Sequence, residues 1–219
     1  MNPVDISLYA ILDPHRANGR TSKDELAALA KAAVRGGATI LQYRHKDADT
    51  RTMVNNARAI LDAMNSSAVP LVINDRVDVA LAVGAQGVHV GQDDMDPVDA
   101  RRLLGPDAII GNSNKTEVHA TSAPVGGLDY AFIGGVFDTA SKDNPTAIGL
   151  EGWQTIADHY RERSPRLPVG AIAGIDSSNI ADVINAGADG VAVISAIFME
   201  EDVEAATRNL SNIIEGSRS

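Results

Sequence analysis

The chain has 219 residues, of which 44% are hydrophobic and 4% aromatic, and its formal net charge is −10. This length suits one α/β barrel, and the few aromatic side chains favour a core of Ala, Val, Ile and Leu over an aromatic-rich β sandwich. The negative charge argues against nucleic-acid binding, and the lack of cysteine excludes disulfides, a thiolate nucleophile and cysteine-ligated zinc.

The N-terminal stretch MNPVDISLYAILD lacks the basic start and the apolar core of a signal peptide. No apolar run in the chain approaches the length of a membrane span. The expected protein is therefore cytoplasmic and has no membrane contact.

Short β-branched runs alternate with amphipathic runs rich in Ala and Leu along the chain. Helices are expected between the β-branched runs, most clearly at residues 22–37, 49–65, 176–188 and 202–216. Several of them open on Ser, Asp or Thr and close near Gly or Asn, as helix capping requires. The fifth helix is the weakest, because Pro124 should shorten it. The expected strands are residues 7–13, 39–45, 70–75, 87–92, 108–114, 130–137, 167–174 and 190–198.

Eight strands alternating with eight helices predict an α/β fold, a single (β/α)8 TIM barrel that spans residues 1–219 as one domain. An open doubly wound sheet is the alternative, and it is disfavoured because no G-x-G-x-x-G turn follows the first strand. In a barrel, the functional residues collect at the carboxyl ends of the strands. The expected ends carry Gln42, Arg44 and Lys46; Asn74 and Asp75; Gln92, Asp93 and Asp94; Asn112 and Ser113; Thr139, Ser141 and Lys142; Gly174; and Ser195.

Gln42, Arg44 and Lys46 are spaced by two, so a strand would present all three on one face. With Lys142 from another strand end, the two cations of this group would suit phosphate oxygens, Arg as a bidentate donor and Lys as a point charge. The alternative is that they are surface cations of an acidic protein.

Asp75 and Asp94 end the third and fourth strands, so neighbouring parallel strands should bring their carboxylates together beside the cations. Two carboxylates, completed by water and substrate phosphate oxygens, form a typical Mg²⁺ site. Alternatively, Asp75 caps the following helix and Asp94 is simply solvated.

The last two strand ends carry a second candidate site, for a separate phosphate. Gly174 would let backbone N–H groups approach the anion, residues 176–179 could begin a helix, and Ser195 could add a hydroxyl. A tight turn alone would also explain Gly174. Two phosphorylated ligands in one barrel indicate group transfer rather than isomerisation. His89 is expected to be a hydrogen-bonded structural histidine.

The motifs LQYRHK, VINDRVDVALAVGAQGVHVGQDD, IIGNSNKT, GGVFDTASK, IGLEGW and GVAVISAIF, in this order, resemble those of the thiamine phosphate synthase family. The resemblance runs through nearly the whole chain. It implies a transferase of thiamine biosynthesis that joins 4-amino-2-methyl-5-hydroxymethylpyrimidine diphosphate to 4-methyl-5-hydroxyethylthiazole phosphate or its carboxylated form. The implied products are thiamine phosphate and pyrophosphate, and the implied cofactor is Mg²⁺.

The resemblance also implies residue roles. Mg²⁺ would be held by Asp75 and Asp94, and catalysis would depend on Arg44, Lys46, Ser113 and Lys142. These groups would stabilise the departing pyrophosphate while the thiazole nitrogen attacks a methylene carbon with carbocation character, and no general base is required. The pyrimidine diphosphate would contact Gln42, Tyr43, Arg44, His45, Lys46, Asn74, Ser113 and Lys142. The thiazole phosphate would contact Thr139, Ala140, Ser141, Gly174, Ile194 and Ser195.

The sequence departs from the family pattern at three positions. Gly135 replaces a proline, Ser141 replaces a threonine, and Ala173 replaces the first of two glycines. Three alternatives stay open: a thiazole tautomerase-like paralogue in which His89 works on the ring, a non-catalytic sensor of a thiamine precursor, and another phosphosugar barrel enzyme. The complete set of cations and carboxylates favours the synthase. The expected partners are small-molecule substrates, and a homo-oligomer is compatible with the sequence.

Overall fold

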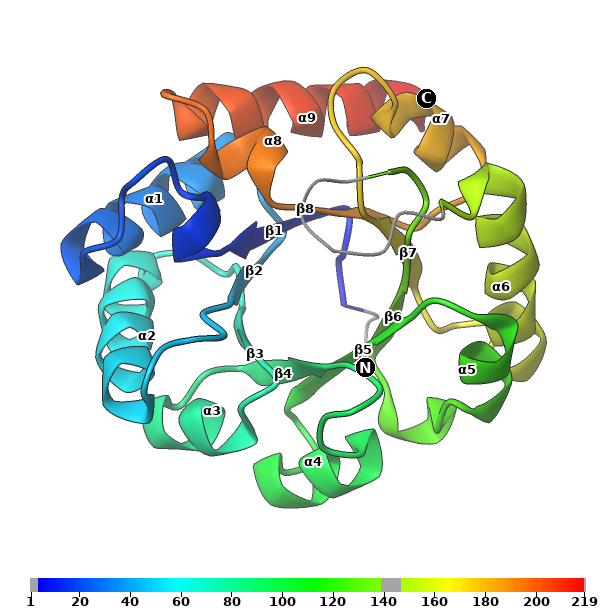
Figure 1. Cartoon of the computed structure of the whole chain (residues 1–219), viewed down its shortest axis with the longest axis horizontal. Coiled ribbons are helices and arrows are strands. Elements are labelled where there is room, and N and C mark those ends of the chain that lie inside the picture. Colours follow the sequence, from blue (N-terminus) through cyan, green and yellow to red (C-terminus); the bar gives the residue numbers. More distant parts are fainter. Residues whose placement is uncertain (1–3, 139–146, 219) are drawn as a thin grey trace.

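The structure, a computed structural model, describes residues 4–138 and 147–218. Within them, eight parallel strands form a closed barrel in chain order, because each strand pairs with the next and the eighth pairs with the first (Figure 1). The predicted (β/α)8 barrel is therefore confirmed. The strands are β1 (Leu8–Leu12), β2 (Ile40–Tyr43), β3 (Leu71–Asn74), β4 (Gly87–Val90), β5 (Ile109–Asn114), β6 (Tyr130–Gly134), β7 (Val169–Ile172) and β8 (Val191–Val193).

The helices surround the barrel and connect successive strands (Figure 1). Two 3-10 turns, η1 (Pro14–Arg16) and η2 (Val125–Gly127), follow β1 and α5. The α-helices of the described residues are α1 (Lys23–Gly36), α2 (Thr50–Met64), α3 (Val77–Val83), α4 (Pro97–Leu104), α5 (Glu117–Ser122), α6 (Gly149–Arg163), α7 (Ile180–Asn185), α8 (Ser195–Phe198) and α9 (Val203–Ser217).

Local signals explain most of these boundaries. Ser22 and Glu25 form a reciprocal capping box at the start of α1, and Gly37 ends that helix with φ 105°. Helix α5 ends at Ser122, ahead of Pro124, as the sequence predicts.

Two expected elements are wrong in detail. Residues 195–198 form the short helix α8 instead of continuing the last strand, which stops at Val193. Residues 177–179 form a turn ahead of the helix, and the Asp176 carboxylate accepts hydrogen bonds from the backbone N–H and the hydroxyl of Ser178. This local turn delays the start of α7 to Ile180.

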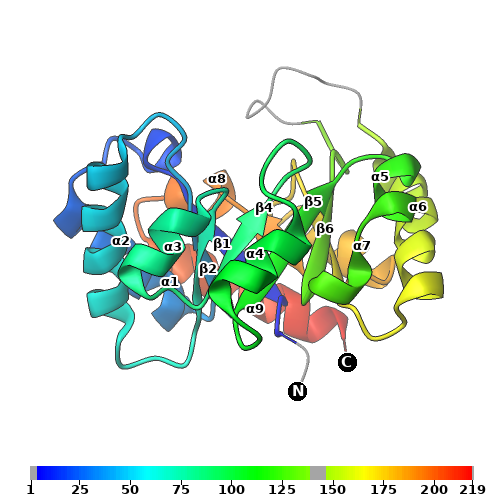
Figure 2. The same ribbon diagram turned by 90° about the horizontal axis from the view of Figure 1, so that it is seen from below.

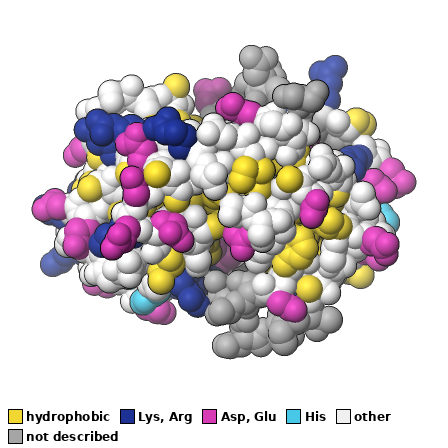
Figure 3. Space-filling model, turned by 90° about the horizontal axis from the view of Figure 1, so that it is seen from above, with side chains coloured by type: hydrophobic (Ala, Val, Ile, Leu, Met, Phe, Trp, Pro, Cys, Tyr) yellow, Lys and Arg dark blue, Asp and Glu magenta, His cyan; other side chains and the backbone are white. Residues whose placement is uncertain are grey.

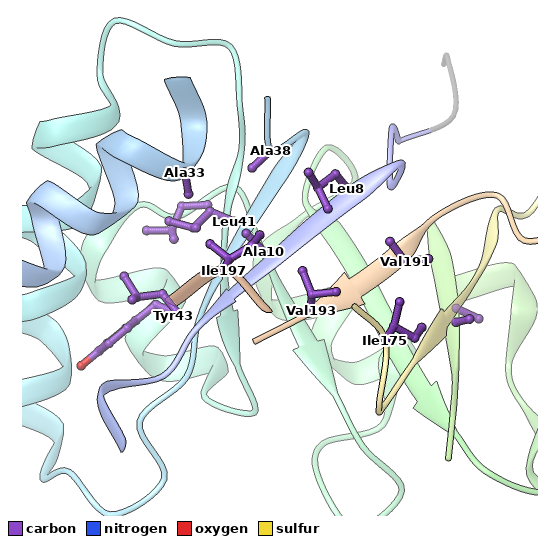
Figure 4. Packing of buried hydrophobic residues seen from close by; sticks show 14 of the residues in the cluster. Leu8, Ala10, Ala33, Ala38, Leu41, Tyr43, Ile175, Val191, Val193 and Ile197 are labelled. Carbon is purple, nitrogen blue, oxygen red and sulfur yellow. The ribbon is translucent and has the colours of Figure 1, made fainter. Parts of the chain in front are cut away.

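Side chains alternate between two buried layers along each strand. The larger layer lies between the barrel and its helices, and Figure 4 shows Ala33 of α1 beside Leu41 of β2 in it. The smaller layer fills the barrel itself with residues such as Tyr9, Val72, Tyr130 and Phe132. Because the period of a strand is two, the same alternation decides which strand-end residues face the barrel axis.

The carboxyl ends of the strands open on one side of the molecule, and the end of α9 lies on the other side (Figure 2). On the face that carries α8 and α9, acidic side chains are spread among basic and apolar ones (Figure 3). Among the described helices, none combines the length and apolar character that crossing a membrane requires.

Candidate functional site

Three of the predicted site residues line the barrel interior at the carboxyl ends of their strands. Gln42 of β2 is 2% exposed and Asn74 of β3 is 8% exposed. Ser113 of β5 also faces inward, because its hydroxyl lies 2.7 Å from Nε2 of the inward-facing His89. The sequence predicted these residues at the carboxyl ends of their strands, without a direction for their side chains.

The expectation that Gln42, Arg44 and Lys46 share one strand is wrong, because β2 ends at Tyr43. Arg44 and Lys46 lie in the connection to α2. The backbone N–H of Arg44 still bonds to the carbonyl of Leu12, 3.0 Å away, which holds the start of this connection against β1. The two cations are therefore positioned by partners outside their own strand.

Arg44 forms an ion pair with Asp13, which follows β1. The Asp13 side chain is only 3% exposed, whereas that of Arg44 is 25% exposed. The second Asp13 oxygen accepts the backbone N–H of His15 at 3.0 Å and so caps η1. A buried carboxylate thus fixes the guanidinium at the mouth of the barrel and leaves a quarter of its side chain open to solvent.

The side chains of Tyr43 and His45 face the helices instead of the barrel axis. Tyr43 is fully buried, and its hydroxyl lies 3.0 Å from the Asn56 amide nitrogen of α2 and 3.1 Å from Nδ1 of His45. Burial raises the pKa of Tyr43 to about 12. The pKa of His45 is lowered by burial and by the neighbouring His15. A ligand at the barrel mouth cannot reach the Tyr43 side chain.

Lys46, Asp75 and Asp94 meet at the ends of β2, β3 and β4. Lys46 Nζ lies 3.3 Å from Asp75 Oδ2. The Asp94 carboxylate lies close enough to Asp75 to raise its pKa, and Asp94 also accepts the backbone N–H of Gly91 at 2.8 Å. The structure therefore brings together the two carboxylates that the sequence predicted as a pair.

This carboxylate pair is electrostatically unfavourable even with Lys46 beside it. Burial raises the pKa of Asp75, the adjacent Asp94 raises it further, and Lys46 opposes this shift. Asp75 also has φ 61°, a left-handed conformation that costs free energy in a residue with a side chain. Its backbone N–H bonds to the carbonyl of His89 at 2.8 Å, and this contact with β4 holds the conformation.

At the second predicted site, the backbone at Gly174 lies very close to the backbone of Asp138. A Cβ atom on Gly174 would lie 2.6 Å from the carbonyl oxygen of Asp138, so the glycine is required by this close approach. The preceding Ala173 has φ 89°, a conformation that suits the glycine usual at this position. Ile194 packs at the edge of the barrel interior, and Ser195 begins α8. Helix α7 starts too late for residues 176–179 to supply helix N–H groups.

Four predicted site residues lie outside the described part of the chain: Thr139, Ala140, Ser141 and Lys142. Their roles stay predictions from the sequence.

Sequence reasoning missed Asp13, Tyr9 and Tyr130. Asp13 had a usable signal, because it is an acidic residue at the end of an apolar strand. The two tyrosines belong to the buried interior. There the Tyr9 hydroxyl accepts a hydrogen bond from the Gln42 amide nitrogen at 2.8 Å. Their only signal was the rarity of aromatic residues in a chain with 4% of them.

The arrangement supplies cations after β2 and carboxylates after β3 and β4. Arg44 and Lys46 can neutralise phosphate oxygens, and the two carboxylates beside Lys46 provide hard oxygen ligands. Among the described residues, no group of three or more His, Cys, Asp or Glu side chains is arranged to hold a metal ion. A metal at Asp75 and Asp94 would therefore complete its shell with water or ligand oxygens, as Mg²⁺ commonly does.

Comparisons with known proteins show the family to which this chain is similar. A family model described as thiamine monophosphate synthase matches residues 8–197. The chain is 52% identical over 218 residues to the thiamine-phosphate synthase of Agrobacterium fabrum strain C58, covering 99% of this chain and 97% of that one. It is 44% identical over 212 residues to the thiamine-phosphate synthase of Chloroflexus aurantiacus, covering 96% and 94%. A solved structure, thiamine phosphate pyrophosphorylase from Pyrococcus furiosus, superposes with a TM-score of 0.83 at 36% identity and covers 99% of this chain and 98% of that chain.

Proposed function

The chain belongs to the thiamine monophosphate synthase family, and we propose that it is a transferase that makes thiamine phosphate. Its substrates would be the diphosphate of 4-amino-2-methyl-5-hydroxymethylpyrimidine and 4-methyl-5-hydroxyethylthiazole phosphate or its carboxylated form. Residues 1–219 would act as one domain, and the cytoplasmic location and homo-oligomeric state stay predictions. The observation that carries the proposal is the contact of Lys46 with the Asp75–Asp94 carboxylate pair.

The proposed reaction transfers the pyrimidinylmethyl group from a diphosphate oxygen to the thiazole nitrogen. The bond from the pyrimidine methylene carbon to the diphosphate oxygen breaks, and its electron pair leaves with pyrophosphate. The lone pair of the thiazole nitrogen then forms the new carbon–nitrogen bond, so no proton has to be removed. The chain must therefore stabilise negative charge on the leaving group and align the two rings.

Arg44 and Lys46 are placed for the first of these tasks. Both lie in the connection from β2 to α2, and carboxylates already fix both side chains. Because Asp13 immobilises the guanidinium before the ligand binds, little reorganisation is needed when charge develops on the leaving oxygen. Lys142 would add a third cation by resemblance.

Asp75 and Asp94 are suited to Mg²⁺. Their oxygens match its preference for hard ligands, and burial and the adjacent Asp94 raise the pKa of Asp75 although Lys46 Nζ lies 3.3 Å away. When bound there, Mg²⁺ would neutralise charge on the diphosphate oxygens. The two carboxylates would hold the ion at the ends of β3 and β4, beside the Lys46 ammonium.

The second ring would be held at the ends of β6, β7 and β8. Gly174, Ile194 and Ser195 lie there, and the Ser195 hydroxyl is a candidate donor to the thiazole phosphate. The turn of residues 176–179 does not offer a helix N-terminus. The phosphate would therefore depend on the serine, on backbone N–H groups near Gly174 and on residues 139–141.

The tautomerase alternative is less well supported by the geometry. Both ring nitrogens of His89 already face hydroxyl groups, Nδ1 at 3.1 Å from Tyr130 and Nε2 at 2.7 Å from Ser113. That environment suits an orienting role better than proton exchange with a substrate ring. The sensor alternative would need no carboxylate pair, which this chain keeps.

The test is formation of thiamine phosphate and pyrophosphate from both substrates, with and without Mg²⁺. Wild type should form both products in a 1:1 ratio only with the metal, and Asp94→Asn should lose most of this activity. Asp93→Asn is the matched control, because it removes the neighbouring exposed carboxylate and should leave turnover nearly unchanged. Wild type that binds the thiazole phosphate but forms no product would refute the proposed synthase.

A further inference from the structure

A line of hydrogen bonds crosses the interior of the barrel from β2 to β5. The Gln42 amide nitrogen contacts the Tyr9 hydroxyl at 2.8 Å, and this hydroxyl lies 2.9 Å from that of Tyr130. The Tyr130 hydroxyl is 3.1 Å from Nδ1 of His89, whose Nε2 is 2.7 Å from the Ser113 hydroxyl. The line thus joins two residues at the barrel mouth, Gln42 and Ser113, through three side chains of the interior.

The chemistry of the groups determines the direction of the line. The Gln42 amide nitrogen can only donate, so the Tyr9 oxygen accepts from it. The buried Tyr9 proton then needs an acceptor, and the Tyr130 hydroxyl, 2.9 Å away, provides it. Tyr130 in turn donates to Nδ1 of His89, which must be unprotonated. Nε2 of His89 then carries the proton and donates to Ser113. The Ser113 hydroxyl proton is left to point toward a ligand.

Burial keeps this direction stable. Tyr9 and Tyr130 are both 0% exposed, and burial raises the pKa of each phenol far above neutrality. Both hydroxyls therefore keep their protons, which the line requires. A break in it would leave buried polar groups without partners, at a cost that favours the fully bonded arrangement.

Ring packing holds the same groups in place. The rings of His89 and Tyr130 stack with an interplanar angle of 22°, and Tyr9 packs edge-on against Phe132 at 4.9 Å. Gly111 provides the space, because a Cβ atom there would lie 2.0 Å from the Tyr130 ring. The hydroxyls therefore have little freedom to choose other partners.

The two ends of the line offer the pyrimidine diphosphate one hydrogen-bond acceptor and one donor. The Gln42 amide has its nitrogen turned to Tyr9, which leaves its oxygen to accept, while Ser113 is left to donate. A 4-aminopyrimidine carries a donating amino group beside an accepting ring nitrogen. If either end reversed, two donors or two acceptors would face each other.

We propose that Tyr9, Tyr130 and His89 are positioning residues that set the amide orientation of Gln42 and the donor direction of Ser113 for the pyrimidine substrate. This inference rests on the proposed function for its substrate. In this proposal the three residues act on the substrate only through the orientation of Gln42 and Ser113.

The test combines kinetics with a measurement on the ligand-free protein. Tyr9→Phe and Tyr130→Phe should each raise the KM for the pyrimidine diphosphate about tenfold, equivalent to about 1.4 kcal/mol, and leave the KM for the thiazole phosphate within about twofold. Tyr160→Phe is the matched control, because it removes a buried hydroxyl that bonds to Asn114 outside the barrel interior. It should change neither KM.

The independent measurement is nitrogen-15 NMR of the histidine rings, with the His89 signals identified by their loss in His89→Gln. The expected wild-type pattern is an unprotonated Nδ1 and a protonated Nε2, with this preference lost in Tyr130→Phe. A protonated Nδ1 in wild type would overturn the proposal. So would a Tyr9→Phe variant whose two KM values change by the same factors as those of Tyr160→Phe. The expected His89 tautomer in a protein without synthase activity would support the line of hydrogen bonds. It would refute only the assignment of the pyrimidine diphosphate as the ligand.

Discussion

Replacing Arg44 with alanine should destabilise the fold as well as impair catalysis. The reason is Asp13, whose side chain is only 3% exposed and would lose its ion-pair partner. Removing one partner of a buried pair costs about 3–5 kcal/mol because the remaining charge stays desolvated.

The structure places this case at the lower end of that range. Asp13 keeps the backbone N–H of His15 as a donor at 3.0 Å, and solvent already reaches a quarter of the Arg44 side chain. We therefore expect a loss of about 3 kcal/mol in the free energy of unfolding. At ~2–4 °C per kcal/mol for a chain of this size, the Tm should fall by about 6–12 °C.

Urea unfolding followed by circular dichroism would measure the loss, and a double-mutant cycle would assign it. Asp13→Asn keeps an acceptor for His15 and removes the buried charge, so the double variant should be about 2 kcal/mol more stable than Arg44→Ala alone. Arg102→Ala is the control, because its ion pair with Asp99 is exposed and should contribute less than about 1 kcal/mol.

Two results would refute this reasoning. One is an Arg44→Ala protein within about 0.5 kcal/mol of wild type, which would mean that Asp13 is solvated without its partner. The other is additivity of the two substitutions, which would mean that they do not interact.

Four further outcomes are expected. Because the folded-state pKa of Asp75 is raised by burial and by Asp94, stability without divalent ions should be greatest below the unfolded pKa of Asp75 and decline as the pH rises through the folded value. Urea titrations across this range should show a smaller decline in Asp94→Asn, and an unchanged decline would contradict the assigned cause. Saturating Mg²⁺ should restore stability in wild type, by about 2.7 kcal/mol at a hundredfold excess over Kd, but not in Asp94→Asn; equal thermal shifts in both proteins would exclude this site. Ala173→Gly should stabilise the protein by about 1 kcal/mol in urea unfolding, because it relieves the left-handed φ of 89°, whereas Gly111→Ala should cost at least ~1–3 kcal/mol because its Cβ would overlap the Tyr130 ring. A less stable glycine variant or a neutral alanine variant would count against these assignments.

Much of the fold follows from local sequence signals. Hydrophobic periodicity depends on neighbouring residues only, so the alternation of strands and helices could be predicted along the whole chain. Gln42 lies at its predicted strand end, and the predicted strand-end positions of Asp75 and Asp94 bring these two residues together.

Strand lengths were less predictable. Arg44 and Lys46 were expected on a strand that ends at Tyr43, and residues 195–198 were expected as a strand but form α8. Both segments have apolar or alternating patterns that suit either state over a few residues. Their conformation depends on whether the neighbouring strand extends far enough to provide backbone hydrogen-bond partners.

The sequence by itself determined the barrel, the polar strand ends and the family, because periodicity and motif order are properties of the chain as written. Only the tertiary structure decided which side chains meet inside that barrel. Tyr9 and Tyr130 are 121 positions apart, and Arg44 and Asp13 are 31 apart. These contacts depend on the register and closure of all eight strands, and a register set by packing between distant strands leaves no local pattern in the sequence.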